Sequence, residues 1–153
     1  MFKNFTVSVV SLNSLVIEEA AGLYGPRIGV FADNVQIIGK LNSTGNGCLS
    51  DQGLGAGTPG NLSLCGGGGA SYSGNGGIAQ PLNSSITQNE CKTIANFSRS
   101  YGVFNDFYMY EGSGGGSIAN SGTGGRGGGI VWLQGMSINM TGSINSNGNN
   151  ATE

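Results

Sequence analysis

The chain reads Val35-Gln-Ile-Ile-Gly-Lys-Leu-Asn-Ser-Thr-Gly-Asn46, and 103 residues later it reads Ile138-Asn-Met-Thr-Gly-Ser-Ile-Asn-Ser-Asn-Gly-Asn149. Five positions are identical in the two copies, and the alternating positions Val35, Ile37 and Leu41 stay apolar. A short alternating segment that recurs after a long interval is typical of one structural unit that is built twice and stacked. The repeat therefore predicts a solenoid, and with it a structural or adhesive role.

Short strands are predicted around both copies. In the first half we expect strands at Ile28 to Phe31, Val35 to Ile38 and Lys40 to Asn42, separated by single Gly or Asx corners. In the second half we expect strands at Ile130 to Leu133, Met136 to Met140 and Ser143 to Asn145, as counterparts of Ile28 to Val30, Asp33 to Ile37 and Lys40 to Asn42. Upstream, residues 4–18 alternate as two further strands, and residues 20–26 are expected to be a connector. Such short strands with sharp corners are typical of the rungs of a parallel β-helix, whereas hairpins need longer strands and dedicated turns.

Composition favours the same all-β class. The chain has 31 glycines and 17 asparagines, and only 9% of its residues are charged. Glycine costs about 1 kcal/mol relative to alanine inside a helix, and Asn, Ser and Thr compete for backbone hydrogen bonds. We therefore expect no long helix.

A glycine-dominated stretch separates the two copies. Its composition alone would equally suit a flexible linker, but apolar and aromatic residues such as Tyr72, Tyr101 and Phe104 are interleaved with the glycines. We predict instead an ordered excursion, in which glycine lets backbones approach closely. The domain organisation is then one β-solenoid unit over residues 1–153, with first rungs at 4–46, the excursion at 47–128, the repeated rung at 129–149 and a tail at 150–153.

The charged residues exclude several classes of function. The net charge is −2 and the six Lys and Arg residues are scattered, so there is no basic stripe for nucleic acid. The longest apolar stretches are too short to span a bilayer, so we expect no membrane insertion.

Catalytic and cofactor motifs are also missing. Without histidine the chain cannot build a Ser-His-Asp or Cys-His site, and we expect no metal and no cofactor. Gly55-Ala-Gly-Thr-Pro-Gly60 matches GxGxxG, but Pro59 stands where a helix would have to begin. The only adjacent acids, Glu18 and Glu19, would point to opposite faces of a strand, and we expect no enzyme activity.

Asn-X-Ser/Thr sequons are more numerous than the composition explains. About four would arise by chance, whereas seven occur, and sequons are glycosylated only in secreted or lumenal chains. We expect Asn42 and Asn139 to hold equivalent positions in the two copies, so that glycans decorate one face at a regular interval. The predicted glycosylation sites are Asn4, Asn42, Asn61, Asn83, Asn96, Asn139 and Asn150.

The three cysteines, Cys48, Cys65 and Cys91, leave more than one pairing open. They lack the CxxC spacing of zinc sites, and an oxidising compartment would leave one disulfide and one spare thiol. We favour Cys65 with Cys91, because this link would close the Asn- and Ser-rich segment between them. Three buried free thiols are the alternative.

The order of motifs is similar to that in a known group of proteins. It runs Gly39-Lys-Leu-Asn-Ser-Thr-Gly-Asn-Gly-Cys48, Gly66-Gly-Gly-Gly-Ala70, Tyr101-Gly102, Glu111-Gly-Ser-Gly-Gly-Gly116, Gly127-Gly-Gly-Ile-Val131 and Gly142-Ser-Ile-Asn-Ser-Asn-Gly148. This order resembles the glycine-rich region of large, poorly characterised cell-surface or secreted proteins of plants, algae and ciliate-type protists. The resemblance implies a parallel β-helix, an adhesin-like extracellular module without assigned enzymatic activity or catalytic residues. The first ten residues alternate like a strand and lack the apolar core of a signal peptide, so we expect an excerpt of a longer chain.

These observations lead to three hypotheses of function. The first is an extracellular structural glycoprotein whose uncapped solenoid ends stack on other copies to form a fibre or surface coat. The second is a carbohydrate-binding adhesin that uses Tyr108 and Tyr110 as stacking platforms, although this aromatic cluster also suits packing of the glycine-rich excursion. The third, less favoured, is an enzyme acting on polysaccharides, which would need two acids brought together by folding.

Overall fold

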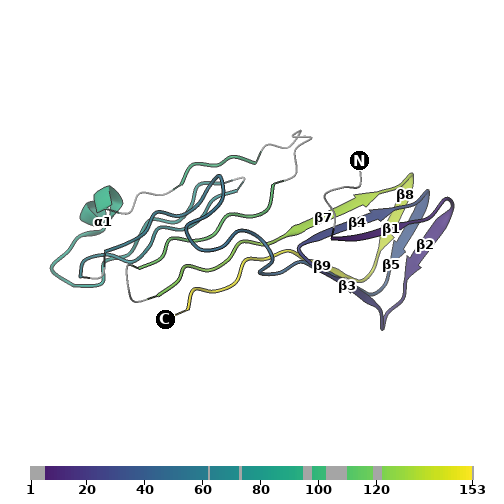
Figure 1. The fold of residues 1–153 in the computed structure, drawn as a ribbon, viewed down its shortest axis with the longest axis horizontal. Coiled ribbons are helices and arrows are strands. Elements are labelled where there is room, and N and C mark those ends of the chain that lie inside the picture. Colours follow the sequence, from purple (N-terminus) through teal and green to yellow (C-terminus); the bar gives the residue numbers. More distant parts are fainter. Residues whose placement is uncertain are drawn as a thin grey trace.

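The computed structural model describes residues 6–61, 63–72, 74–94, 98–102, 110–118 and 122–152. The fold is all-β in class, with strands gathered at one end of an elongated molecule (Figure 1). The strands are β1 (Val7–Val10), β2 (Ser14–Ile17), β3 (Gly22–Tyr24), β4 (Arg27–Phe31), β5 (Asn34–Ile37), β6 (Lys40–Asn42), β7 (Ile130–Gln134), β8 (Ser137–Met140) and β9 (Ser143–Asn145). They form three parallel sheets, ordered β1-β4-β7, β2-β5-β8 and β3-β6-β9.

Three successive groups of three strands, here called rungs, build these sheets, and each group supplies one strand to every sheet. β1 to β3 form the first rung, β4 to β6 the second and β7 to β9 the third. The offset of 103 residues is confirmed in all three sheets, since the register pairs Arg27 with Ile130, Asn34 with Ser137 and Lys40 with Ser143. The two copies of the repeated string therefore lie side by side, one in the second rung and one in the third.

One strand of the first rung lies where only a connector was predicted. β3 occupies residues 22–24, and its Leu23 pairs with Leu41 of β6. The segment shows no alternation of apolar and polar residues and has no part in the repeated string, so its pairing with the neighbouring rung determines this strand.

The hydrophobic core consists of aliphatic columns that run through the rungs. The second rung is the most deeply buried, and Ile28, Val30, Ile37 and Leu41 have no exposed surface. Each full burial of such a side chain is worth about 1.5–3 kcal/mol. The columns follow from the parallel register, which places Ile37 between Ile17 and Met140.

The glycine that recurs in both copies of the repeated string, Gly39 and Gly142, marks a corner shared by successive rungs. A Cβ at Gly39 would overlap the carbonyl oxygens of Glu18 and Ala21, and a Cβ at Gly142 would overlap that of Gly39. The N–H of Lys40 donates to the Ala21 carbonyl at this corner, at 3.0 Å. Both copies therefore need glycine here because the turns of neighbouring rungs touch backbone to backbone.

The glycine-rich excursion is an ordered bundle of extended segments in the residues described. Figure 1 shows these segments running side by side away from the sheets. Segment 112–117 exchanges backbone hydrogen bonds with segments 47–52, 57–60, 66–68 and 125–128. A pleated strand offers hydrogen bonds to two neighbours at most, because its N–H and C=O groups lie in one plane. The backbone groups of this segment instead point in several directions around its axis.

The spacing of these bonds shows the local conformation. In three pairs of neighbouring segments, two successive hydrogen bonds are separated by three residues along each of the two segments. The N–H to C=O pairs are Gly112 to Gly128 with Gly115 to Gly125, Gly57 to Gly114 with Gly60 to Ser117, and Gly68 to Thr58 with Ser71 to Gly55. A repeat of three residues per turn in an extended chain is that of the polyproline II helix, which leaves its backbone free to bond outward.

A small second core closes the far end of the bundle. Helix α1 (Gln88–Ile94) begins with a capping box, in which the Thr87 N–H donates to Glu90 Oε2 at 2.7 Å and the Glu90 N–H to Thr87 Oγ1 at 3.3 Å. Cys91 on this helix is joined to Cys65 by a disulfide, the pairing favoured from the sequence. Both cysteines are fully buried and pack with Ala79.

Candidate functional site

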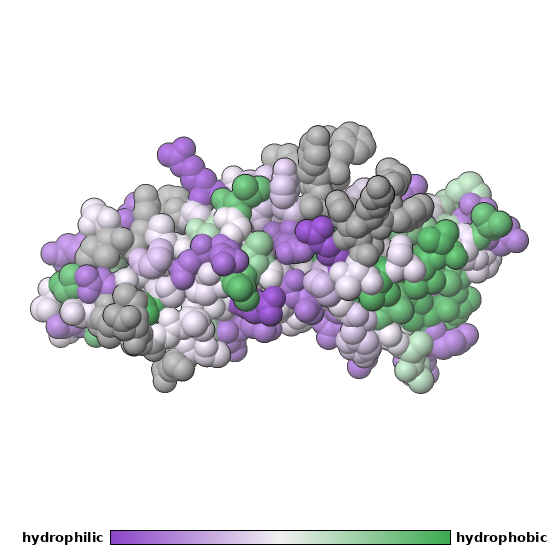
Figure 2. Space-filling model, viewed as in Figure 1, coloured by the Kyte–Doolittle hydropathy of each residue, from purple (hydrophilic) through white to green (hydrophobic). Residues whose placement is uncertain are grey.

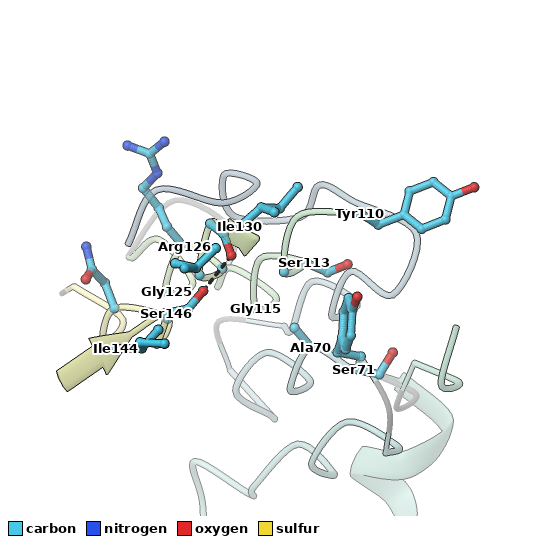
Figure 3. Close-up of a pocket in the computed structure, with 18 of the residues that line it drawn as sticks. Ala70, Ser71, Tyr110, Ser113, Gly115, Gly125, Arg126, Ile130, Ile144 and Ser146 are labelled. Atoms are coloured by element: carbon cyan, nitrogen blue, oxygen red, sulfur yellow. Dashed lines mark hydrogen bonds between the residues drawn. The ribbon is translucent and has the colours of Figure 1, made fainter. Parts of the chain in front are cut away.

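A groove of about 780 Å³ lies on the glycine bundle and reaches the beginning of β7 and the end of β9. Its floor is glycine backbone from segments 112–115 and 125–129. In Figure 3 the Tyr110 ring and the Arg126 guanidinium lie on opposite sides of the view, with the backbone of Gly115 and Gly125 between them. Tyr72, Ser113 and Asn149 also line the groove, and the Ser146 Oγ at its edge donates to the Gly129 carbonyl.

Two exposed tyrosines form one end of the groove and are held by a third. The rings of Tyr72 and Tyr110 each meet Tyr101 edge to face, with centroids 5.0 and 6.2 Å from it. Tyr72 and Tyr110 remain 44% and 39% exposed. Edge-to-face contacts fix ring orientation, so both outer rings are presented in a defined direction.

Tyr101 is fixed in turn by hydrogen bonds to the bundle. Its Oη donates to the Glu111 carbonyl at 2.8 Å and accepts from Ser113 Oγ at 2.9 Å. The same Ser113 Oγ accepts the N–H of Gly55 at 2.9 Å. Burial raises the pKa of the Tyr101 hydroxyl, which therefore stays protonated at neutral pH.

An ion pair joins the second rung to the segment that carries Tyr110. Arg27 Nε lies 2.6 Å from Glu111 Oε1, and both side chains are partly buried. Cys48, the cysteine outside the disulfide, is half-buried nearby. Burial, followed by the negative charge of Glu111, raises the pKa of its thiol.

Of the two tyrosines predicted to stack on glycans, Tyr110 lines the groove and Tyr108 lies outside the described residues. Sequence reasoning missed Tyr72, which was interpreted only as an anchor of the excursion. Trp132 pairs with Gly29 in sheet register and lies between the inward residues Val131 and Leu133, on the outer side of β7. Its indole nitrogen is buried, with no hydrogen-bond partner in the part of the chain that the structure describes.

The structure corrects the expected equivalence of two sequons. Asn42 pairs with Asn145 in the sheet of β6 and β9, whereas Asn139 pairs with Gln36 in the sheet of β5 and β8. The two asparagines therefore lie on different sheets, because the offset of 103 residues carries Asn42 to Asn145. Asn42 is also half-buried, and its Oδ1 accepts the N–H of Thr44 at 2.9 Å.

The other sequons fall into two groups. Asn4 and Asn96 lie outside the described residues. The exposed sequon asparagines are Asn61, Asn83, Asn139 and Asn150.

Motifs for other chemistry do not converge on a site. Across the described ranges, no three His, Cys, Asp or Glu residues gather as a metal site would require. The GxGxxG match at residues 55–60 is an extended segment of the bundle, and no helix follows it directly. Within the same ranges, no helix has the length and apolar character needed to cross a lipid bilayer.

No family model, curated protein or solved structure matches this chain.

Proposed function

We propose that this chain is an extracellular structural glycoprotein, a β-solenoid subunit of a fibre or surface coat that grows by stacking of rungs. The three parallel sheets, the short strands and the shared corners support a parallel β-helix with a long ordered lateral excursion. The motif order that resembles glycine-rich cell-surface proteins points in the same direction.

The observation that carries the proposal is the open end of the third rung. β7, β8 and β9 are the outer strands of all three sheets, so three strand edges at the same end pair with no further strand among the residues that the structure describes. Three inward side chains of this rung are exposed, with Ile138, Met140 and Ile144 at 45%, 49% and 36%, whereas Ile37 and Leu41 beneath two of them are at 0%. Figure 2 shows a hydrophobic patch at the end of the molecule that holds the sheets. Exposed edges combined with an apolar face favour further strand pairing.

The first rung of a second copy has side chains that suit this end. Its inward residues Val7, Val9, Leu15, Ile17 and Leu23 would extend the five columns that now end on Val131, Leu133, Ile138, Met140 and Ile144. Every member of these columns is apolar. Head-to-tail contact of this kind is heterologous and does not close on itself, so it produces filaments in place of dimers.

Glycosylation at exposed sequons would suit a surface coat, because glycans on the outer faces leave the two ends free. Asn139 projects from β8 between the inward residues Ile138 and Met140, and thus from the outer face of its sheet.

Two substitutions with equal exposure test the stacking. Ile138 and Val16 are both 45% exposed in the same sheet, but only Ile138 lies in an inward column at the open end. We expect the wild-type chain to form filaments in electron micrographs and to sediment as a concentration-dependent assembly. Ile138→Glu should abolish both without changing the circular dichroism spectrum, whereas Val16→Glu should assemble normally. A wild-type chain that stays monomeric at all concentrations, or equal behaviour of the two variants, would show that the proposal is wrong.

Native material tests the glycoprotein part separately. Peptide mass spectrometry should find N-glycans on Asn139 and on other exposed sequons. Unmodified asparagines throughout would remove the extracellular assignment and leave the stacking experiment unaffected.

A further inference from the structure

The groove on the glycine bundle has backbone donors that remain unused. The amide N–H groups of Ser113, Gly125 and Gly128 have no acceptor within the described residues, although all three residues line the groove. Unpaired backbone donors in a folded chain are uncommon, since each one costs roughly 1–3 kcal/mol when it is removed from water. Their shared position marks a place where a ligand with acceptors would gain hydrogen bonds.

The direction of these donors follows from the planar peptide. The carbonyl of Gly127 accepts the Gly47 N–H at 2.8 Å, and the described chain has no cis peptide bond. The N–H of Gly128 belongs to the same trans peptide unit and points the opposite way, away from segment 43–48. By the same reasoning the Ser113 N–H points away from Cys48, whose N–H bonds the Gly112 carbonyl at 3.0 Å. No residue of segment 43–48 lines the groove, so the N–H groups of Gly128 and Ser113 face the groove side of the bundle.

The spacing of the free donors matches the bundle itself. Gly125 and Gly128 are three residues apart, and their own carbonyls already bond Gly115 and Gly112 at that spacing. Elsewhere in the bundle, donors spaced in this way bond a neighbouring extended segment with three residues per turn. The groove thus presents backbone donors with the spacing that one further extended segment of the bundle would need.

The aromatic end of the groove suits the same ligand. Grooves lined by aromatic side chains are a common means of recognising polyproline II segments, whose conformation is fixed before binding. Tyr72 and Tyr110 supply such a wall, held by Tyr101. The glycine floor permits close backbone approach, so a ligand with small residues would fit best.

We propose that this groove binds an extended glycine-rich peptide segment of another chain in the conformation with three residues per turn. Ligand carbonyls three residues apart accept from the N–H groups of Gly125 and Gly128, a further carbonyl accepts from Ser113, and the peptide packs against Tyr72 and Tyr110. The inference is independent of rung stacking, since it uses a different surface and needs only the monomer.

The test uses a capped peptide with the sequence of residues 122–129, Gly-Thr-Gly-Gly-Arg-Gly-Gly-Gly, titrated into ¹⁵N-labelled protein at a concentration where the chain is monomeric. We expect the amide signals of Ser113, Gly125 and Gly128 to shift downfield and to exchange more slowly with solvent. A peptide with alanine in place of every glycine should not bind. Tyr72→Ala should weaken binding about tenfold, which corresponds to the loss of one aromatic contact.

Tyr24→Ala is the matched control, because Tyr24 is an exposed tyrosine on β3 that does not line the groove. It should leave the affinity unchanged. The proposal is overturned if the glycine peptide causes no shift at millimolar concentration, or if the shifts occur away from these amides. It is equally overturned if cellohexaose shifts the same amides at lower concentration than the peptide, because the groove would then be a carbohydrate site.

Discussion

Replacing Gly127 with alanine tests whether the glycine-rich excursion is a packed bundle or a linker. A Cβ at this position would overlap the Gly112 carbonyl oxygen, which is backbone and cannot rotate away. Segments 112–116 and 124–129 would have to separate. Three hydrogen bonds would then be strained, namely those from Gly112 to Gly128, from Cys48 to Gly112 and from Gly127 to Cys48, at 2.8, 3.0 and 3.0 Å.

The magnitude follows from these contacts. Each hydrogen bond contributes about 0.5–1.5 kcal/mol net, and overpacking of a well-filled site costs about 1–3 kcal/mol. We therefore expect Gly127→Ala to lower the free energy of unfolding by about 2–4 kcal/mol. For a chain of this length, that loss lowers Tm by about 5–15 °C. Thermal and urea unfolding, followed by circular dichroism and tyrosine fluorescence, would measure it.

Gly77 provides the control within the same excursion. A Cβ there would meet no atom within 4 Å, and its φ is not in the left-handed region. Gly77→Ala should be neutral or should stabilise by about 0.4–1 kcal/mol, because alanine restricts the unfolded chain. Equal stability of the two variants would refute the packed bundle and would restore the linker interpretation.

Three further predictions concern the core, the helix and the free thiol. Ile37→Ala should cost about 2–5 kcal/mol and Ile37→Val about 0.5–1.5 kcal/mol in urea unfolding, whereas Met140→Ala at the open end should cost about 1 kcal/mol, because Met140 is 49% exposed. The Glu90 carboxylate accepts hydrogen bonds from Thr87, which lower its pKa, so its contribution to helix stability should be present at neutral pH and disappear as pH falls through the depressed pKa. The backbone N–H of residue 87 is the larger cause and persists in Thr87→Ala, so an NMR titration of that variant should show the Glu90 pKa rising only part of the way towards its ordinary value; an unchanged pKa would show that the Thr87 hydroxyl does not bond the carboxylate. Burial and Glu111 raise the pKa of Cys48, so at pH 8 it should react with iodoacetamide more slowly in the folded than in the urea-unfolded chain, and equal rates would argue against this environment.

Most strands of the rungs could be predicted from sequence, because they alternate apolar with polar residues or recur in the repeated string. Val35 and Ile37 alternate with polar residues, and the string that contains them recurs at a fixed offset. β3 has no such pattern, and it exists only through its pairing with β6. Local periodicity or recurrence of the string therefore predicts a strand, including the three-residue β6 and β9, whereas β3 has neither signal.

The interior of the excursion was predictable only in outline. Interleaved aromatic residues indicated order, but glycine has no side chain whose pattern could show which segments lie together. Helix α1 was not predicted, although the spacing of Thr87 and Glu90 is a visible capping signal. Tyr110 was recognised as a candidate from its aromatic neighbours, while Tyr72 reaches the same groove from a segment nearly forty residues earlier. The error over Asn42 and Asn139 came from following the sequon pattern, since the offset of 103 residues already pairs Asn42 with Asn145 in the sequence.

The position of the excursion between the second and third rungs has a consequence for how the chain folds. β1 finds β4 across 21 residues, from Val7 to Ile28, whereas β7 must find β4 across 103 residues. Closing the longer loop costs only about 1.4 kcal/mol more in chain entropy, since this cost grows with the logarithm of length. The folding rate depends more strongly than the stability on such contacts between residues far apart in the sequence. The first two rungs should therefore form early as a template, and the third rung should dock last, once the glycine segments have collapsed beside it.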